Sequence, residues 1–161
     1  SDPIARQQIP DPQAASTFLA SRLSWDERLA EPHASTLRLY QALLILRRRE
    51  PTLRCPSTFH VAALDDATIA IRRDGSHDAF LVVARLKGAG VIDLRHGRFS
   101  ARSSNSDALA GPWEMVLTSE DSAFSADPSP PDFDWTRQGL AIRFLRPSAV
   151  VLRRERGRKL P

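Results

Sequence analysis

The sequence predicts a mainly β chain with an N-terminal helical segment, and two observations support this fold class. Residues Ala34–Glu50 repeat leucines and a tyrosine at helical spacing. Beyond Cys55, apolar residues alternate or form short runs that end at turn-forming residues. A chain of 161 residues with 42% hydrophobic residues can bury one good core.

Short elements are expected in the first 32 residues. Ser1–Gln13 contains three prolines and little periodicity, which predicts an extended connector. Ala14–Leu23 has apolar residues at roughly helical spacing, so one or two helical turns are expected there. Ser24 and Glu27 have the spacing of a capping box, in which each side chain pairs with the other residue's free amide. A short helix is therefore expected from Ser24 to near Pro32.

Ala34–Glu50 predicts a long amphipathic helix that ends at Pro51, because proline cannot continue a helix. A helix of this length is marginal in water by itself, so it needs a surface to pack against. The face predicted to make that contact carries Leu37, Tyr40, Leu43, Leu44 and the aliphatic stem of Arg47.

Short apolar segments without an intervening helix predict an antiparallel β-sandwich or barrel after Cys55. Ser103–Asp107 is expected to be a polar loop, and Ser119–Gln138 a long exposed loop pinned by its aromatic residues. The predicted strands are Phe59–Leu64, Thr68–Arg73, Ala79–Leu86, Gly90–Leu94, Glu114–Thr118, Gly139–Leu145 and Ala149–Arg153.

Charge and composition narrow the classes of partner. The net charge of +4 comes from arginines concentrated in Arg47–Arg49 and Arg153–Lys159. The first cluster lies at the end of the predicted helix, where positive charges stabilise the helix dipole. The second cluster is typical of a solvated tail. No nucleic-acid partner is therefore predicted. No apolar run is long enough to cross a bilayer, which predicts no membrane partner. Cys55 is the only cysteine, which excludes an intramolecular disulfide and favours a cytoplasmic setting.

Residues that could carry chemistry are sparse. The four histidines lie apart from one another without metal-ligand spacing, and no phosphate-binding glycine motif occurs, so no metal and no cofactor are predicted. Ser57, His60 and Asp65 could be imagined as a triad, but a strand and its turn explain them without catalysis. Glycoside hydrolysis needs two facing carboxylates. The candidates by residue type, which we interpret as solvated charges, are Asp11, Asp26, Glu27 and Glu31.

Two motifs carry a family resemblance. Pro-Asp-Pro-Gln at Pro10–Gln13, followed by Thr17-Phe18 and by Ser-Arg-Leu-Ser-Trp at Ser21–Trp25, resembles the segment near the end of the catalytic barrel in maltooligosyltrehalose trehalohydrolases. That family belongs to the alpha-amylase superfamily of glycoside hydrolases. The second motif, Leu44–Pro51, is similar to the last barrel helix of many members of the superfamily. Arg22 and Ser24 depart from the lysine and aspartate usual in the family, but they keep the charge or the capping ability.

The resemblance implies that residues 1–52 are the last connection and the final helix of a (β/α)8 barrel. Residues 53–161 would then be an antiparallel C-terminal β-sandwich domain. The chain is too short for a whole barrel of about 250 residues, so the remainder of the barrel would be its partner.

The family hydrolyses the α-1,4 glucosidic bond next to the terminal trehalose of maltooligosyltrehalose and releases trehalose. Its catalytic acids lie on earlier strands, so the resemblance implies no catalytic residue in this chain, which would be inactive alone. It places Asp11, Gln13 and Trp25 nearest to the maltooligosaccharide substrate. Two alternatives stay open. One is the tail of a branching enzyme or amylase. The other is a non-catalytic carbohydrate-binding module that uses Trp113, Phe133 and Trp135.

Overall fold

The computed structural model describes residues 11–94, 113–136 and 139–155, which form two compact units, Ser1–Ala34 and Ser35–Pro161. The first unit contains α2 (Ala15–Ala20) and a 3₁₀ helix, η1 (Trp25–Leu29). The polar loop expected at Ser103–Asp107 lies outside the described residues. None of the helices in the described ranges combines the length and the apolarity needed to span a bilayer.

The capping box predicted at Ser24 and Glu27 is wrong. Ser24 precedes η1, but its side chain makes no capping hydrogen bond. The tighter 3₁₀ turn is closed by backbone bonds instead, with the Glu27 amide donating to the Ser24 carbonyl and the Ala30 amide to the Glu27 carbonyl. The Glu27 carboxylate lies 3.8 Å from Nε2 of His33. The predicted helix is therefore present as a single short turn.

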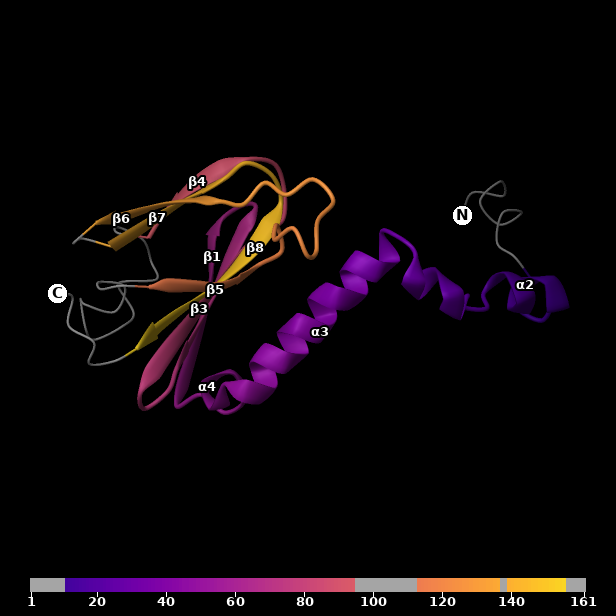
Figure 1. Ribbon diagram of the computed structural model, residues 1–161, viewed down its shortest axis with the longest axis horizontal. Helices are drawn as coiled ribbons and strands as arrows, with labels where there is room; N and C mark the ends of the chain where they lie inside the picture. The colour runs from indigo at the N-terminus through magenta and orange to yellow at the C-terminus, as the bar shows by residue number, and fades with distance from the viewer. Residues whose placement is uncertain (1–10, 95–112, 137–138, 156–161) are drawn as a thin grey trace, which may run out of the picture. The chain divides into compact units, whose positions relative to one another are not determined.

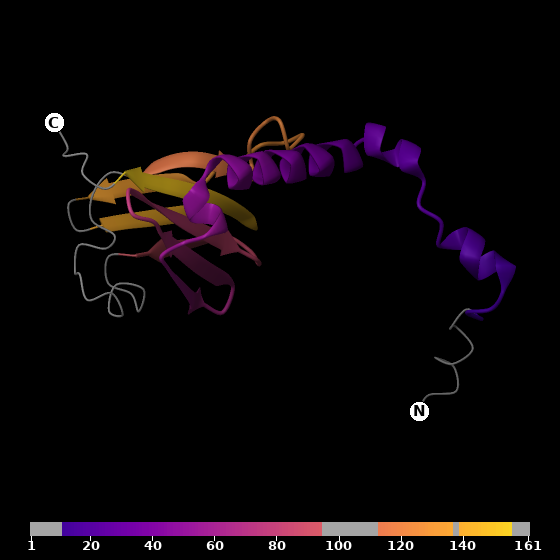
Figure 2. The same ribbon diagram turned by 90° about the horizontal axis from the view of Figure 1, so that it is seen from below.

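The long helix is confirmed as α3 (His33–Arg49), and a second short helix, α4 (Pro51–Arg54), follows it directly. Glu50 separates them in an extended conformation, because the ring of the following proline disfavours the helical conformation of the residue before it. Pro51 then occupies the first turn of α4, where its missing amide hydrogen is not needed. Figures 1 and 2 show α3 leading through α4 into the first strand.

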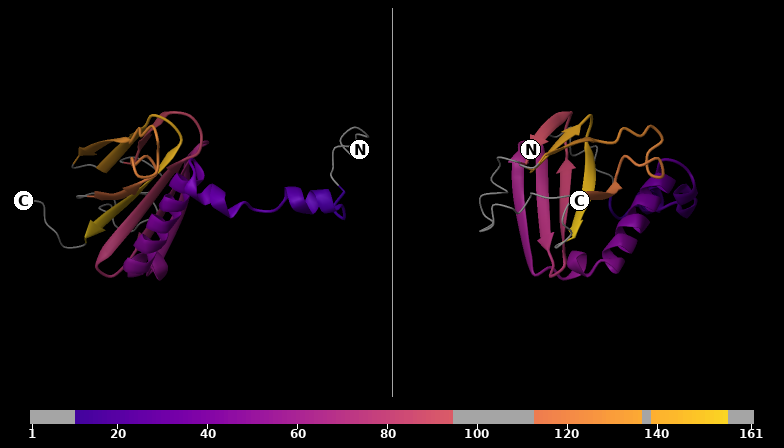
Figure 3. Two further views of the ribbon diagram at one scale, coloured as in Figure 1. Left: turned by 45° about the vertical axis from the view of Figure 1, so that its right-hand side comes forward. Right: turned by 60° about the vertical axis from the view of Figure 1, so that its left-hand side comes forward.

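Two antiparallel sheets follow α4 in the second unit (Figure 1). The larger sheet has the order β1-β2-β3-β8-β5 and the smaller has the order β4-β7-β6. Figure 3 shows β8, the last strand in sequence, inside the larger sheet. The strands are β1 (Thr58–Asp65), β2 (Thr68–Asp74), β3 (Asp78–Arg85), β4 (Gly90–Asp93), β5 (Glu114–Thr118), β6 (Asp132–Thr136), β7 (Gly139–Phe144) and β8 (Ser148–Glu155).

The facing sides of the two sheets form one core. It takes alternate residues from the central strands of the larger sheet, as expected for strands with one face packed against a second layer. Leu81 and Leu152 contribute from the larger sheet, and Leu140, Ile142 and Phe144 from the smaller one, all without solvent exposure. We call the two sheets and this shared core the β body. The prediction of antiparallel strands is thereby confirmed.

The prediction of one long loop over Ser119–Gln138 is wrong in part, because β6 lies within it. Polar contacts hold the part of the segment before β6. The Arg146 Nε donates to the buried carboxylate of Glu120 at 2.9 Å, and Glu120 also accepts the Ser129 amide at 3.0 Å. Arg146 reaches Asp127 as well, at 3.2 Å between the charged groups. The residues of β6 alternate between polar and apolar, as a strand does, but the prolines and serines before them favour a loop for the segment as a whole.

Candidate functional site

The three predicted sugar-binding residues lie exposed in the first unit. The Gln13 amide donates to Oδ1 of Asp11 at 2.9 Å, and the Ala14 amide donates to the Asp11 carbonyl at 3.1 Å. Asp11 therefore closes the turn that starts α2. Trp25 opens η1 with 69% of its surface exposed. The structure gives Asp11 a structural contact, and sugar binding by these residues stays a prediction.

The candidate carboxylates in η1 are surface groups. Asp26 and Glu27 both lie in its first turn, where acidic side chains favour the positive end of the helix dipole. The contact between Glu27 and His33 joins two side chains that are each about 60% exposed. Within the described ranges, no group of three or more histidine, cysteine, aspartate or glutamate residues is arranged to hold a metal ion.

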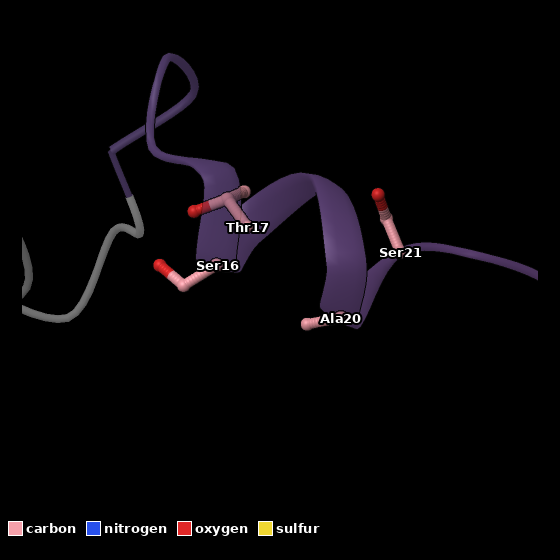
Figure 4. Close-up of a pocket in the computed structure, with 4 residues that line it drawn as sticks. All are labelled: Ser16, Thr17, Ala20 and Ser21. Carbon is pink, nitrogen blue, oxygen red and sulfur yellow. The ribbon is translucent and has the colours of Figure 1, made fainter.

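A shallow surface pocket of about 450 Å³ lies along α2. Its lining residues are small, and Figure 4 shows Ser16 and Ala20 one helical turn apart. The Ser21 hydroxyl donates to the Phe18 carbonyl at 2.9 Å, so part of the pocket's polarity is already satisfied. The four lining residues, which include no acid, base or aromatic ring, are Ser16, Thr17, Ala20 and Ser21. The lining can accommodate an apolar contact but supplies no charged catalytic group.

The most distinctive surface of the second unit is the outer face of α3. Leu37, Tyr40 and Leu44 recur at helical spacing on this face, and Tyr40 and Leu44 are 63% and 52% exposed. On the other side of the helix, Ser35 is buried and Leu39 is half-buried. We call Leu37, Tyr40 and Leu44 the outer stripe. The face that the sequence predicted to pack against a partner is thus the face that the described chain leaves uncovered.

A second apolar surface lies on the larger sheet, on the side away from the core. Phe59 and Val61 of β1 are exposed there, beside Ile69 of β2. The sequence of β1 carries a signal for this surface. In β1 both alternating sets are apolar, because Ala62 and Leu64 face the core while Phe59 and Val61 do not. Strands that are apolar on both faces are typical of sheets covered on both sides.

The imagined triad is a set of structural residues. The Ser57 amide donates to the Asp74 carbonyl at 2.7 Å, and His60 is exposed on β1. Asp65 accepts the Ala67 amide at 2.8 Å and an Arg85 nitrogen at 3.0 Å. The Ala67 amide, and to a lesser degree the contact with Arg85, lowers the pKa of Asp65. Asp65 therefore holds the turn between β1 and β2 in its charged form.

The aromatic residues of the proposed carbohydrate-binding module do not form an exposed row. Trp113 is buried, with the Arg154 guanidinium 5.2 Å from its ring centre. Phe133 packs on the core and stacks against Trp135, with 5.7 Å between the ring centres and 14° between the ring planes. Trp135 is 41% exposed. Only one ring of the three therefore offers a substantial surface to a sugar.

Sequence comparison finds partial homology to malto-oligosyltrehalose trehalohydrolases. The chain is 57% identical over 47 residues to the enzyme of Deinococcus radiodurans, and 49% identical over 45 residues to that of Rhizobium sp. strain M-11. These matches cover 29% and 28% of this chain but only 8% of each relative. No family model matches the chain.

Structural comparison finds the fold in an alpha-amylase. The crystal structure of the alpha-amylase from H. orenii matches with a TM-score of 0.59 at 13% sequence identity. The match covers 89% of this chain and 25% of the amylase chain. A stretch of 47 residues is thus similar to trehalohydrolases, the fold is similar to part of an alpha-amylase, and the chain spans a small part of the proteins it matches.

Proposed function

We propose that this chain is the C-terminal portion of a glycoside hydrolase that cleaves the α-1,4 bond next to the terminal trehalose of maltooligosyltrehalose. Residues 1–52 would complete a catalytic barrel and residues 53–161 would form the β domain after it. The catalytic acids would lie in the rest of the barrel, and Asp11, Gln13 and Trp25 would contribute to its sugar-binding rim. A cytoplasmic setting remains a prediction.

The single observation behind this proposal is the 57% identity over 47 residues to the Deinococcus radiodurans trehalohydrolase. The uncovered outer stripe of α3 fits the same interpretation. Three large apolar side chains on one exposed helix face are typical of a surface that is covered in the complete molecule. The remainder of the barrel would supply that cover.

A chimera tests the proposal. The corresponding C-terminal segment of the Deinococcus radiodurans trehalohydrolase is replaced by this chain, and release of trehalose from maltooligosyltrehalose is measured. We expect trehalose release by the chimera and none by the truncated enzyme that lacks the segment. A chimera that folds but releases no more trehalose than the truncated enzyme would favour the alternative, the tail of an amylase or branching enzyme.

Two leucines provide a matched control for docking of the outer stripe. Leu44 and Leu145 are 52% and 51% exposed, so a charge at either position costs the isolated chain little. In the chimera, Leu44→Asp would place an unpaired carboxylate in the contact with the barrel, whereas Leu145→Asp would stay in water. We expect L44D to lower trehalose release at least tenfold more than L145D, because burial of an unpaired charge costs well over about 1.4 kcal/mol. Equal effects would contradict docking through this stripe.

The carbohydrate-binding alternative rests on the exposed part of Trp135. Titration of the isolated chain with maltooligosaccharides, followed by tryptophan fluorescence, tests it. Binding at this site would give a saturable change that the Trp135→Ala variant loses. A flat titration up to millimolar sugar would exclude the module interpretation and leave the hydrolase proposal unaffected.

A further inference from the structure

Near its N-terminal end, α3 makes a polar contact with the segment between β5 and β6. The Arg38 Nε donates to the Ala123 carbonyl at 2.7 Å, between residues 85 positions apart in the sequence. Another nitrogen of the same guanidinium donates to the buried Ser35 hydroxyl at 3.2 Å. Ala123 lies in the segment between β5 and β6, which Arg146 pins through Glu120. We call the contact between Arg38 and Ala123 the loop anchor.

At its other end, α3 leads into a cluster of charged and polar side chains that we call the polar latch: Glu50, Thr52, Asp78 and Arg153. The buried Thr52 hydroxyl donates to the buried carboxylate of Asp78. Arg153 lies 3.6 Å from that carboxylate and 3.6 Å from the Glu50 carboxylate. The latch therefore joins the start of α4 to the first residue of β3 and to β8.

The turn between β2 and β3 leaves room for the contact between Thr52 and Asp78. Gly75 lies between β2 and β3, and a methyl group at this position would collide with the Thr52 side chain and with the Asp78 carboxylate. The Arg73 Nε donates to the Thr52 carbonyl at 3.4 Å, so the α4 backbone is also held. Glycine is thus required here by the close approach of the latch.

We infer that the loop anchor and the polar latch fix the direction of α3 relative to the β body before any other surface covers the helix. Hydrogen bonds are directional, whereas apolar contacts alone permit many orientations. With polar contacts at both ends, α3 can leave Leu37, Tyr40 and Leu44 uncovered. The helix is therefore pre-oriented for docking, and that docking role rests on the proposed function.

Distance measurements between two spin labels test the inference on the chain alone. Cys55 is replaced by serine, and labels are attached at Gln41→Cys on α3 and at Arg143→Cys on β7, both exposed positions. We expect a narrow distance distribution in this parent. Thr52→Val and Glu50→Gln should each broaden it, because each removes one partner of the latch. Asp66→Asn, a change of an exposed acid in the turn after β1, should leave it narrow.

Amide hydrogen exchange provides a second measurement. Loss of one latch contact should speed exchange of α4 and of the last turn of α3 about tenfold, while the core strands keep their protection. Circular dichroism shows whether each variant keeps its β body.

A broad distribution in the parent, or equal widths in folded parent and latch variants, would overturn the inference. Neither measurement uses trehalose release. Failure of the chimera would therefore leave the anchors standing, and free movement of α3 would leave the proposed function standing.

Discussion

The β body and α3 place similar apolar side chains in opposite environments. Phe144, Leu140 and Leu152 are fully buried between two sheets, whereas Tyr40 and Leu44 are more than half exposed. The β body thus completes its own core within this chain, as an independently folding domain does. α3 does not, and its stability depends on polar anchors and on whatever surface covers it. The apolar residues of one segment therefore do not show which other part of the protein packs against them.

The largest expected effect lies in the β body. Phe144→Ala removes a fully buried ring from the core, and should lower the free energy of unfolding by about 3 to 5 kcal/mol. Urea unfolding followed by the fluorescence of the buried Trp113 measures this change. A loss below about 1 kcal/mol would mean that the sheets do not pack as one core.

The buried ion pair of β2 should give the next largest effect. The Arg72 Nη2 lies 2.7 Å from Oδ1 of Asp74, and both side chains are almost fully buried. Asp74→Ala leaves the arginine charge uncompensated, which should cost about 3 kcal/mol in the same unfolding measurement. The double variant Arg72→Met and Asp74→Leu removes both charges and should recover much of this loss. Equal losses in the single and double variants would show that the pair itself is not the cause.

Asp65 should give a small effect that depends on pH. Its pKa is lower in the folded chain than in the unfolded one, so its stabilising effect is present above the unfolded pKa. That stabilisation disappears as the pH falls through the folded pKa. Because this carboxylate is partly exposed, the contribution should stay below about 1 kcal/mol. Asp65→Asn should lower stability at pH 7 and match the parent at low pH, whereas Asp66→Asn should follow the parent throughout.

The smallest effect is expected on the outer stripe. In the isolated chain, Leu44→Ala should change the free energy of unfolding by less than about 0.5 kcal/mol, because half of this side chain is already in water. Truncation of a buried leucine to alanine typically costs about 2 kcal/mol or more of unfolding free energy. A loss of that size would show that the described chain already covers α3. The contrast between the two regions would then disappear.

Regular periodicity predicted most of the fold. Glu114–Thr118 was placed to the residue, and α3 to within one residue at each end, because their apolar spacing is uninterrupted. β6 was missed because the proline-rich and serine-rich residues before it favour a loop, although its own residues alternate as a strand does. The capping box failed because spacing alone cannot distinguish an α-helix from a single 3₁₀ turn.

The candidate site could be predicted from the sequence less completely than the fold. Spacing located the apolar face of α3, but the environment of a face depends on residues far away in the sequence. The polar latch is an example, since it joins Glu50 and Thr52 to Asp78 and Arg153. No local sequence pattern relates these four positions. Taken singly, each is a residue type that is mostly found on protein surfaces. The division of the chain into domains at residues 1–52 and 53–161 stays a prediction.

The position of β8 has a consequence for synthesis of the chain. β8 lies between β3 and β5, and its pairs with β3 join residues such as Val83 and Val150 that are far apart in sequence. A ribosome emits β3 long before Glu155, so β3 must wait with one edge unpaired until the last strand emerges. Contacts of such long range also slow folding. During translation the larger sheet is therefore exposed to wrong pairing, although its central strands are well buried afterwards.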